Sequence, residues 1–293
     1  MSQLKTPAPH QRSATGDRLS ALLRERQPWY SLPREFYKDH AVYEAELERI
    51  WKRGWLFVGH SCEISEPGQY VTFRVDNDSL IVVRGDEGQL QAFWNICRHR
   101  GTELCHQNSG KVGRFVCPYH QWTYTRDGEL ASCRGMQDEL DKSQLGLLPA
   151  QAREVGGMVY ASLSESPPDF DEAARTMGPL LKPQGLNAAK VAKTVDYEVC
   201  ANWKTVWENN RECYHCNVNH PQYIKANFDH YNADDTSDRV QCRIDEVVSR
   251  SQSKWREHNL HVDHQRTGMV TFPDVERNLW FSANRTALVE GYV

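Results

Sequence analysis

The sequence predicts an α+β fold in which a small all-β domain lies between two helical segments. Apolar residues recur with helical spacing from Leu32 to Trp55. Short runs that alternate apolar and polar residues, separated by turns, then follow up to about Leu163. Helical spacing returns around Trp203, after a boundary rich in Ser, Pro and acidic residues at Ser164 to Asp171.

The length and composition are those of a globular protein with one large or two ordinary domains. The chain has 293 residues, 39% of them hydrophobic and 25% charged, and its formal net charge of −4 gives no sign of a nucleic-acid partner. No apolar run reaches the roughly 18 residues that span a bilayer, and the N-terminal stretch lacks the apolar core of a signal peptide. Nine cysteines, an odd number, indicate metal ligands and free thiols. We therefore expect a cytoplasmic protein without nucleic-acid or membrane partners.

Turns and apolar spacing give the order of the elements. The turns lie at Pro67-Gly68, at Gly85 to Gly88 and at Asp127-Gly128. Helices are expected at Arg18 to Arg26, from Ser164–Asp171 to about Leu181, and from Asn202, and strands at Tyr70–Val75, Leu80–Val83, Leu90–Ile96, Arg114–Val116, Gln121–Thr125, Val191–Val199, Thr267–Phe272 and Asn278–Ala283.

Two short segments of the β region each combine one cysteine with one histidine. They are Cys97-Arg98-His99 and Cys117-Pro118-Tyr119-His120, so each loop offers one thiolate and one imidazole, and the two loops can close around one centre. Structural zinc is an alternative, because two Cys and two His also suit a tetrahedral ion. Zinc motifs, however, usually pair Cys with Cys and His with His, whereas each loop here mixes the two.

A second candidate site lies in the segment Asn202 to His220, NWKTVWENNRECYHCNVNH. Glu212 and His215 are three residues apart, so a helix would place them on one face. His220 follows five residues after His215, where the helix is expected to end or to be distorted. Imidazole and carboxylate ligands together suit a non-haem Fe(II) site with open positions for oxygen.

The two motifs in this order resemble the catalytic (alpha) subunits of the Rieske non-haem iron oxygenases. The similarity extends over the strings YSLPREFY, GWLFVGH, NICRHRG, CPYHQWTY and NWKTVWENNRECYHC. It implies a homotrimer in which an acidic residue bridges the two metal centres of neighbouring subunits. The residues that it implies are Cys97, His99, Cys117 and His120 for a [2Fe–2S] cluster, His215 and His220 for a mononuclear Fe(II), and Glu212 for the catalytic bridge.

Most ring-hydroxylating members have Asp at the bridge. With Glu there, the sequence resembles the quaternary-ammonium branch of the family, and within it most nearly the enzymes that act on glycine betaine and stachydrine. The resemblance implies oxidation of an N-methyl group with O2. Electrons would come from NAD(P)H through a flavin- and ferredoxin-type reductase. Two alternatives stay open: an oxygenase that hydroxylates aromatic rings, and a non-catalytic Rieske-type electron carrier.

The resemblance also implies a domain organisation. Residues 1–45 form an N-terminal segment that packs on the catalytic domain, 46–165 the Rieske domain, and 166–293 a partial helix-grip catalytic domain with an antiparallel sheet. In the family a carboxylate completes the mononuclear iron site far beyond the second histidine. We therefore expect the chain to be truncated before this third ligand, which the sequence does not identify.

Overall fold

A computed structural model describes residues 9–28, 30–137, 139–182, 185–211, 215–219 and 237–239, together with Cys242, Glu246 and Ser249. Helices lie on both sides of the β region in the sequence, as predicted. They are α1 (Pro9–Glu25), α2 (Glu35–Lys38), α3 (His40–Glu46), a π-helix η1 (Leu47–Trp51), 3-10 helices η2 (Ser61–Ile64), η3 (Lys142–Leu145) and η5 (Leu186–Ala188), α4 (Phe170–Leu181), α5 (Trp203–Arg211) and α6 (Cys216–Asn219). None of the described helices is long and apolar enough to cross a membrane.

The described strands form one seven-stranded sheet and one three-stranded sheet, and every pairing is antiparallel. The order in the large sheet is β1-β10-β9-β4-β3-β2-β5, and in the small sheet β6-β7-β8. The strands are β1 (Leu56–His60), β2 (Gln69–Val75), β3 (Asp78–Arg84), β4 (Leu90–Trp94), β5 (Ser109–Lys111), β6 (Phe115–Val116), β7 (Thr123–Tyr124), β8 (Leu130–Ser132), β9 (Pro149–Val155) and β10 (Met158–Ser162).

Strand β3 is buried on both of its faces, because two hydrophobic cores flank the large sheet. Leu80 and Val82 belong to the first core, while Ile81 and Val83, which point the other way, belong to the second. The second core also contains Cys97 and Cys117. The predicted cluster ligands are therefore anchored in a packed core.

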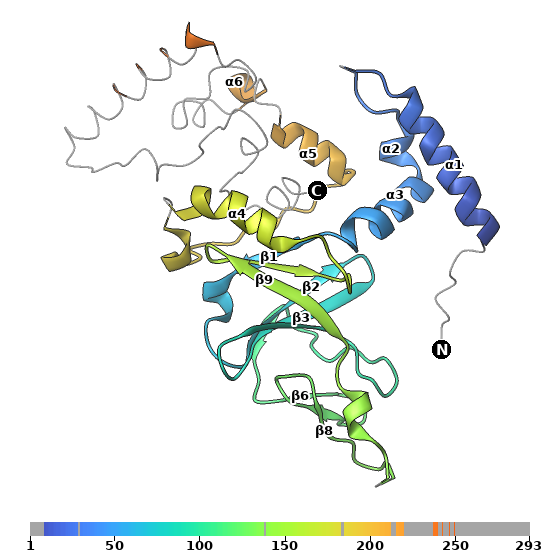
Figure 1. Ribbon diagram of the computed structural model, residues 1–293, viewed down its shortest axis with the longest axis vertical. Helices are drawn as coiled ribbons and strands as arrows, with labels where there is room; N and C mark the ends of the chain where they lie inside the picture. The colour runs from blue at the N-terminus through green and yellow to red at the C-terminus, as the bar shows by residue number, and fades with distance from the viewer. Residues whose placement is uncertain are drawn as a thin grey trace.

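Helix α4 packs on the first core, and the small sheet with β6 and β8 lies at the end of the β region away from α4 (Figure 1). Asp169 caps the helix, since its side chain accepts a hydrogen bond from the Asp171 N–H at 2.9 Å. Phe170, Met177 and Leu181 pack into the first core. A helix after the predicted boundary thus shares a core with the sheet before it, and the boundary at residue 165 stays a prediction.

The predicted strand at Val191–Val199 is wrong. These residues have no regular secondary structure and none of the described strands pairs with them, whereas a strand needs a neighbour for its backbone hydrogen bonds. The apolar side chains that predicted the strand are not buried, because Val195, Tyr197 and Val199 are all exposed. The strands predicted at Thr267–Phe272 and Asn278–Ala283 lie outside the described residues.

Candidate metal centre

The two predicted ligand loops have the same backbone hydrogen bonds. The N–H of each cysteine donates to the carbonyl five residues later, Cys97 to Thr102 and Cys117 to Trp122, both at 2.8 Å. The N–H of the fourth residue after each cysteine donates back to the cysteine carbonyl, at 3.0 Å in both loops. Each loop is thus closed by two internal hydrogen bonds.

Both loops turn through a residue with positive φ at the equivalent position. This residue is Gly101 (φ 74°) in the first loop and Gln121 (φ 61°) in the second. The left-handed region is free for glycine and costs other residues about 1–2 kcal/mol. The turn is therefore required by the loop geometry, and the second loop adopts it without a glycine.

Each loop is the tip of a short antiparallel pair. An isolated bridge joins Ile96 to Glu103 beside the first loop, and the β6–β7 pairing joins Val116 to Thr123 beside the second. The two loops are therefore near-copies, each carried by its own pair of extended segments.

The two thiols lie close together and inside the protein. Cys97 and Cys117 are buried, and burial raises the pKa of the Cys97 thiol, with a further increase from Cys117. The hydroxyl of Tyr124, 3.2 Å from Cys97 Sγ, lowers this pKa in turn. Tyr124 also accepts a hydrogen bond from the Arg98 N–H at 3.0 Å, so its own proton is available to the sulfur.

The two imidazoles form a second pair. The ring centroids of His99 and His120 are 4.6 Å apart, and His99 stacks on Trp122 at 4.8 Å with an interplanar angle of 7°. Burial lowers the pKa of His99, and electrostatic interaction with His120 and Arg100 lowers it further. The Nδ1 atom of His99 is buried without a hydrogen-bond partner among the described residues. A neutral ring with an unused nitrogen is a suitable metal ligand.

This pairing of donors suits a centre with two metal ions. A [2Fe–2S] cluster of the Rieske type takes two Cys on one iron and two His on the other. The structure places thiol beside thiol and imidazole beside imidazole, which matches this division of the ligands between two irons. The four predicted ligands therefore fit the cluster that the sequence predicted.

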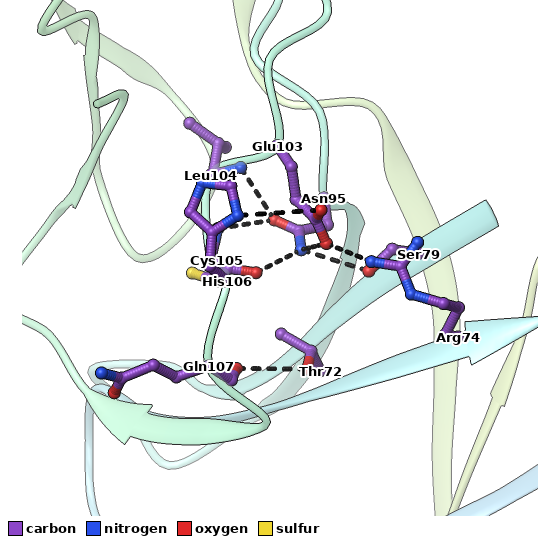
Figure 2. Close-up of polar contacts among 9 residues, drawn as sticks. All are labelled: Thr72, Arg74, Ser79, Asn95, Glu103, Leu104, Cys105, His106 and Gln107. Carbon is purple, nitrogen blue, oxygen red and sulfur yellow. Dashed lines mark hydrogen bonds and ion pairs between the residues drawn. The ribbon is translucent and has the colours of Figure 1, made fainter. Parts of the chain in front are cut away.

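A buried asparagine beside the first loop holds it in place, as Figure 2 shows. Asn95 is 0% exposed. Its Oδ1 accepts hydrogen bonds from the N–H groups of Leu104 and Cys105, and its Nδ2 donates to the Cys105 carbonyl at 2.8 Å and to Ser79 Oγ at 3.1 Å. This one side chain hydrogen-bonds both the segment that follows the loop and strand β3 of the large sheet.

An ion pair extends the same network toward the surface (Figure 2). Asn95 Nδ2 also donates to Glu103 Oε1, which receives a second hydrogen bond from Arg74 at 2.6 Å. Sequence reasoning did not assign roles to Asn95, Trp122 or Tyr124, although all three stand in the strings that carry the resemblance. Their position in the sequence, next to the ligand motifs, was the one signal that could have identified them.

The second predicted site is only partly described. Helix α5 begins as predicted, because Asn202 Oδ1 accepts a hydrogen bond from the Lys204 N–H at 3.1 Å. His215 lies just before α6, and its carbonyl accepts from the Asn219 N–H at 3.0 Å. Glu212 and His220 lie outside the described residues. The structure therefore locates one of the three residues predicted in this segment.

Comparison with known families gives the class of the protein. Residues 54–145 match the Rieske [2Fe–2S] domain, and residues 186–287 match the catalytic domain of the ring-hydroxylating alpha subunits. The first match contains both ligand loops, and the second contains the segment of His215. The chain belongs to the family of Rieske oxygenase alpha subunits, in which a [2Fe–2S] cluster accompanies a mononuclear iron.

Individual relatives of the chain are oxygenase subunits of enzymes named for quaternary ammonium substrates. The glycine betaine monooxygenase oxygenase subunit of Chromohalobacter salexigens is 40% identical over 100% of this chain and 62% of its own length. The carnitine monooxygenase oxygenase subunit of Acinetobacter pittii is 34% identical over 67% of this chain and 54% of its own. The chain thus spans less than two thirds of these relatives.

Solved structures have the same fold. The quaternary ammonium Rieske monooxygenase CntA in complex with L-carnitine matches with a TM-score of 0.62 and 33% identity, over 66% of this chain and 56% of that one. Naphthalene 1,2-dioxygenase with bound indole matches with a TM-score of 0.55 and 30% identity, over 64% and 44%. Both confirm the predicted α+β class.

Proposed function

We propose that this chain is part of an oxygenase component that oxidises an N-methyl group of a quaternary ammonium compound such as glycine betaine. The observation that carries the proposal is the paired-donor centre of the two loops. It occurs in a chain that is 40% identical, over its whole length, to a glycine betaine monooxygenase oxygenase subunit. The dioxygenase match is weaker, at 30% identity, and makes aromatic-ring hydroxylation the second candidate.

The proposed roles follow the sequence motifs. Cys97 and Cys117 bind one iron of the cluster, and His99 and His120 bind the other. His215 and His220 bind the mononuclear Fe(II), and Glu212 bridges the two centres. A carboxylate that accepts N–H hydrogen bonds from a cluster histidine and an iron histidine fixes the tautomer and orientation of both rings.

The chemistry is that of an oxygenase with two electrons supplied from outside. When bound, the irons store electrons and activate oxygen, while the protein supplies ligands and a water-poor pocket. One oxygen atom is inserted into a methyl C–H bond, and the other leaves as water with two protons. The resulting N-hydroxymethyl group breaks its C–N bond and releases formaldehyde. A flavin- and ferredoxin-type reductase that oxidises NAD(P)H supplies the electrons.

The proposed assembly is a cytoplasmic homotrimer in which Glu212 connects the cluster of one subunit to the iron of its neighbour. A structure of a related quaternary ammonium Rieske monooxygenase gives insights into inter-subunit electron transfer in that enzyme. Light scattering of the purified oxygenase tests the assembly, since a monomer would leave the cluster without a neighbouring iron.

Iron content and turnover test the function directly. We expect three irons per chain in the full-length oxygenase, with glycine betaine-dependent oxygen consumption and equimolar formaldehyde when reductase and NAD(P)H are supplied. Two irons and a reducible cluster without oxygen consumption would instead indicate an electron carrier. Turnover with naphthalene but not with glycine betaine would favour the second candidate.

The bridging role of Glu212 has its own test. Glu212→Gln keeps the size of the side chain but accepts an imidazole N–H more weakly, so both metals stay bound while kcat falls by on the order of a hundredfold. Glu198→Gln is the matched control, because Glu198 is exposed and precedes α5. Near-normal turnover of Glu212→Gln would remove the bridging role.

A further inference from the structure

A buried ion pair connects helix α5 to the end of helix α3. Lys204 Nζ lies 2.5 Å and 2.7 Å from the two carboxylate oxygens of Glu46, and the Trp203 indole N–H donates to the same carboxylate at 2.9 Å. The side chains of Lys204 and Glu46 are only 7% and 10% exposed. One carboxylate thus holds two consecutive residues at the start of the helix.

Neighbouring groups also help to orient helix α5. Glu46 is the last residue of α3, and α5 lies beside α2 and α3 in Figure 1. The carboxylate meets the first turn of α5, where the helix dipole favours a negative charge. Trp51, at the end of η1, meets Trp203 edge-on with ring centroids 5.2 Å apart. The end of α3 and η1 therefore pack against the beginning of α5.

A second contact holds the helix one turn further along. The Tyr37 hydroxyl, from α2, donates to Glu208 Oε1 at 2.6 Å. Lys204 and Glu208 are four residues apart and share one face of α5. Two anchors on one face fix both the rotation of the helix and its position along its axis. Glu212 follows Glu208 after a further four residues.

Orientation explains such a pair better than stability does. A buried ion pair is a weak source of stability, because removing two charges from water costs about as much as their attraction returns. It is nevertheless demanding in geometry, since any other placement leaves a charge buried without a partner. A shift of α5 against α2 and α3 would break the contacts at Lys204 and at Glu208 together.

We propose that Glu46, Lys204 and Tyr37 are positioning residues that set the place of α5, and with it the place of Glu212 and His215. The inference rests on the proposed function, because it assigns these residues to electron transfer through Glu212 and to the iron bound by His215. None of the three positioning residues is itself proposed to touch metal or substrate.

Glu46→Gln tests the pair in the full-length, iron-loaded oxygenase. Gln retains the size and one acceptor but loses the charge that Lys204 requires. We expect an altered electron paramagnetic signal from the nitric oxide adduct of the mononuclear iron, and oxidation of the reduced cluster by O2 and glycine betaine slowed about tenfold or more. The visible spectrum and potential of the cluster stay unchanged. Glu48→Gln is the control, since Glu48 pairs with Lys52 at the surface.

Tyr37→Phe is the second variant, and it decides the question if Glu46→Gln does not fold. It removes only one hydroxyl, and Tyr30→Phe is its matched control, because Tyr30 is exposed. We expect the same change in the nitric oxide signal with a smaller loss of rate. The proposal is overturned if both variants show the wild-type nitric oxide signal and wild-type electron transfer, even if their melting temperatures fall. If only Tyr37→Phe folds, the same result in that variant alone overturns it.

The nitric oxide signal separates this proposal from the proposed function. If the wild-type protein fails to oxidise glycine betaine, the proposed substrate is wrong. The comparison of nitric oxide spectra between wild type and variants still tests the positioning, since it requires only bound iron.

Discussion

At the scale of single residues, Tyr124 links the two halves of the metal centre. It follows the second loop in the sequence, but its hydroxyl contacts the sulfur of Cys97 and the backbone of Arg98 in the first. Its ring is fully buried, and burial, followed by the contact with Cys97, raises its pKa well above the ordinary value for tyrosine. The hydroxyl therefore keeps its proton to a higher pH than an ordinary tyrosine does.

Tyr124→Phe should lower the reduction potential of the cluster. A hydrogen bond to a thiolate ligand withdraws negative charge and so favours the reduced state. Its loss is expected to lower the potential by roughly 40 mV, which is about 1 kcal/mol for one electron. Redox titration followed by the visible spectrum measures this. An unchanged potential would mean that the hydroxyl contact is lost once the cluster is bound.

The backbone turn of the second loop gives another prediction at this scale. Gln121→Gly should raise the free energy of unfolding by about 0.5–1 kcal/mol, because glycine relieves the left-handed strain at some cost in chain entropy. Gly101→Ala should lower it by about 1 kcal/mol, purely through the backbone, since a Cβ there meets no atom within 4 Å. Urea unfolding of both variants checks the opposite signs.

Sequence reasoning at the residue scale predicted the candidate ligands but not the residues that hold their loops. Cys97, His99, Cys117 and His120 were predictable because metal ligands of these types have a characteristic spacing. Tyr124 and Asn95 act on groups that the fold brings near them, and hydrogen bonding of this kind leaves no periodicity in a sequence. The positive φ at Gln121 was hidden for a similar reason, because glutamine does not signal a left-handed turn.

At the scale of elements, the first cluster loop depends on one side chain between β4 and the returning chain. Asn95→Ala should lower the free energy of unfolding by about 3–5 kcal/mol, because it leaves buried N–H and C=O groups of Leu104 and Cys105 without partners. Asn108→Ala is the control, since that side chain is exposed in the same region. Chemical denaturation measures both. A loss below about 1 kcal/mol for Asn95→Ala would show that water replaces its hydrogen bonds.

The helices illustrate what local signals specify. The Asn202 cap and the end of α4 at Leu181 were predicted, because caps and apolar spacing are local features. The contact between Glu46 and Lys204 was not, since 158 residues separate the two in the sequence. The strand predicted at Val191–Val199 failed for a related reason: alternation indicates an extended chain, whereas a sheet also requires a neighbour.

At the scale of the whole molecule, the large sheet separates two cores that should respond differently to loss of iron. The second core contains Cys97 and Cys117, whereas the first contains α4 and strands β1 and β10. Metal binding stabilises the part of the fold that contains the ligands, because the folded chain binds the metal and the unfolded chain does not. The cluster should therefore stabilise the second core much more than the first.

Hydrogen exchange with and without the cluster tests this asymmetry. Removing iron under reducing conditions should reduce protection in β6, β7 and β8 by at least tenfold, while β9 and β10 keep theirs. Equal losses in both cores would show that the domain unfolds as one unit. A mild chelator treatment that leaves the fold intact, checked by circular dichroism, is the necessary control.

The backbone turn that the two ligand loops share has a consequence for protein engineering. Each six-residue unit is closed by its own main chain and projects one sulfur and one imidazole from a two-stranded stem. Such a unit can be transferred to another protein. Two units on adjacent hairpins of an unrelated β scaffold, with an aromatic side chain stacked between them, would supply the cluster ligands of an artificial electron carrier.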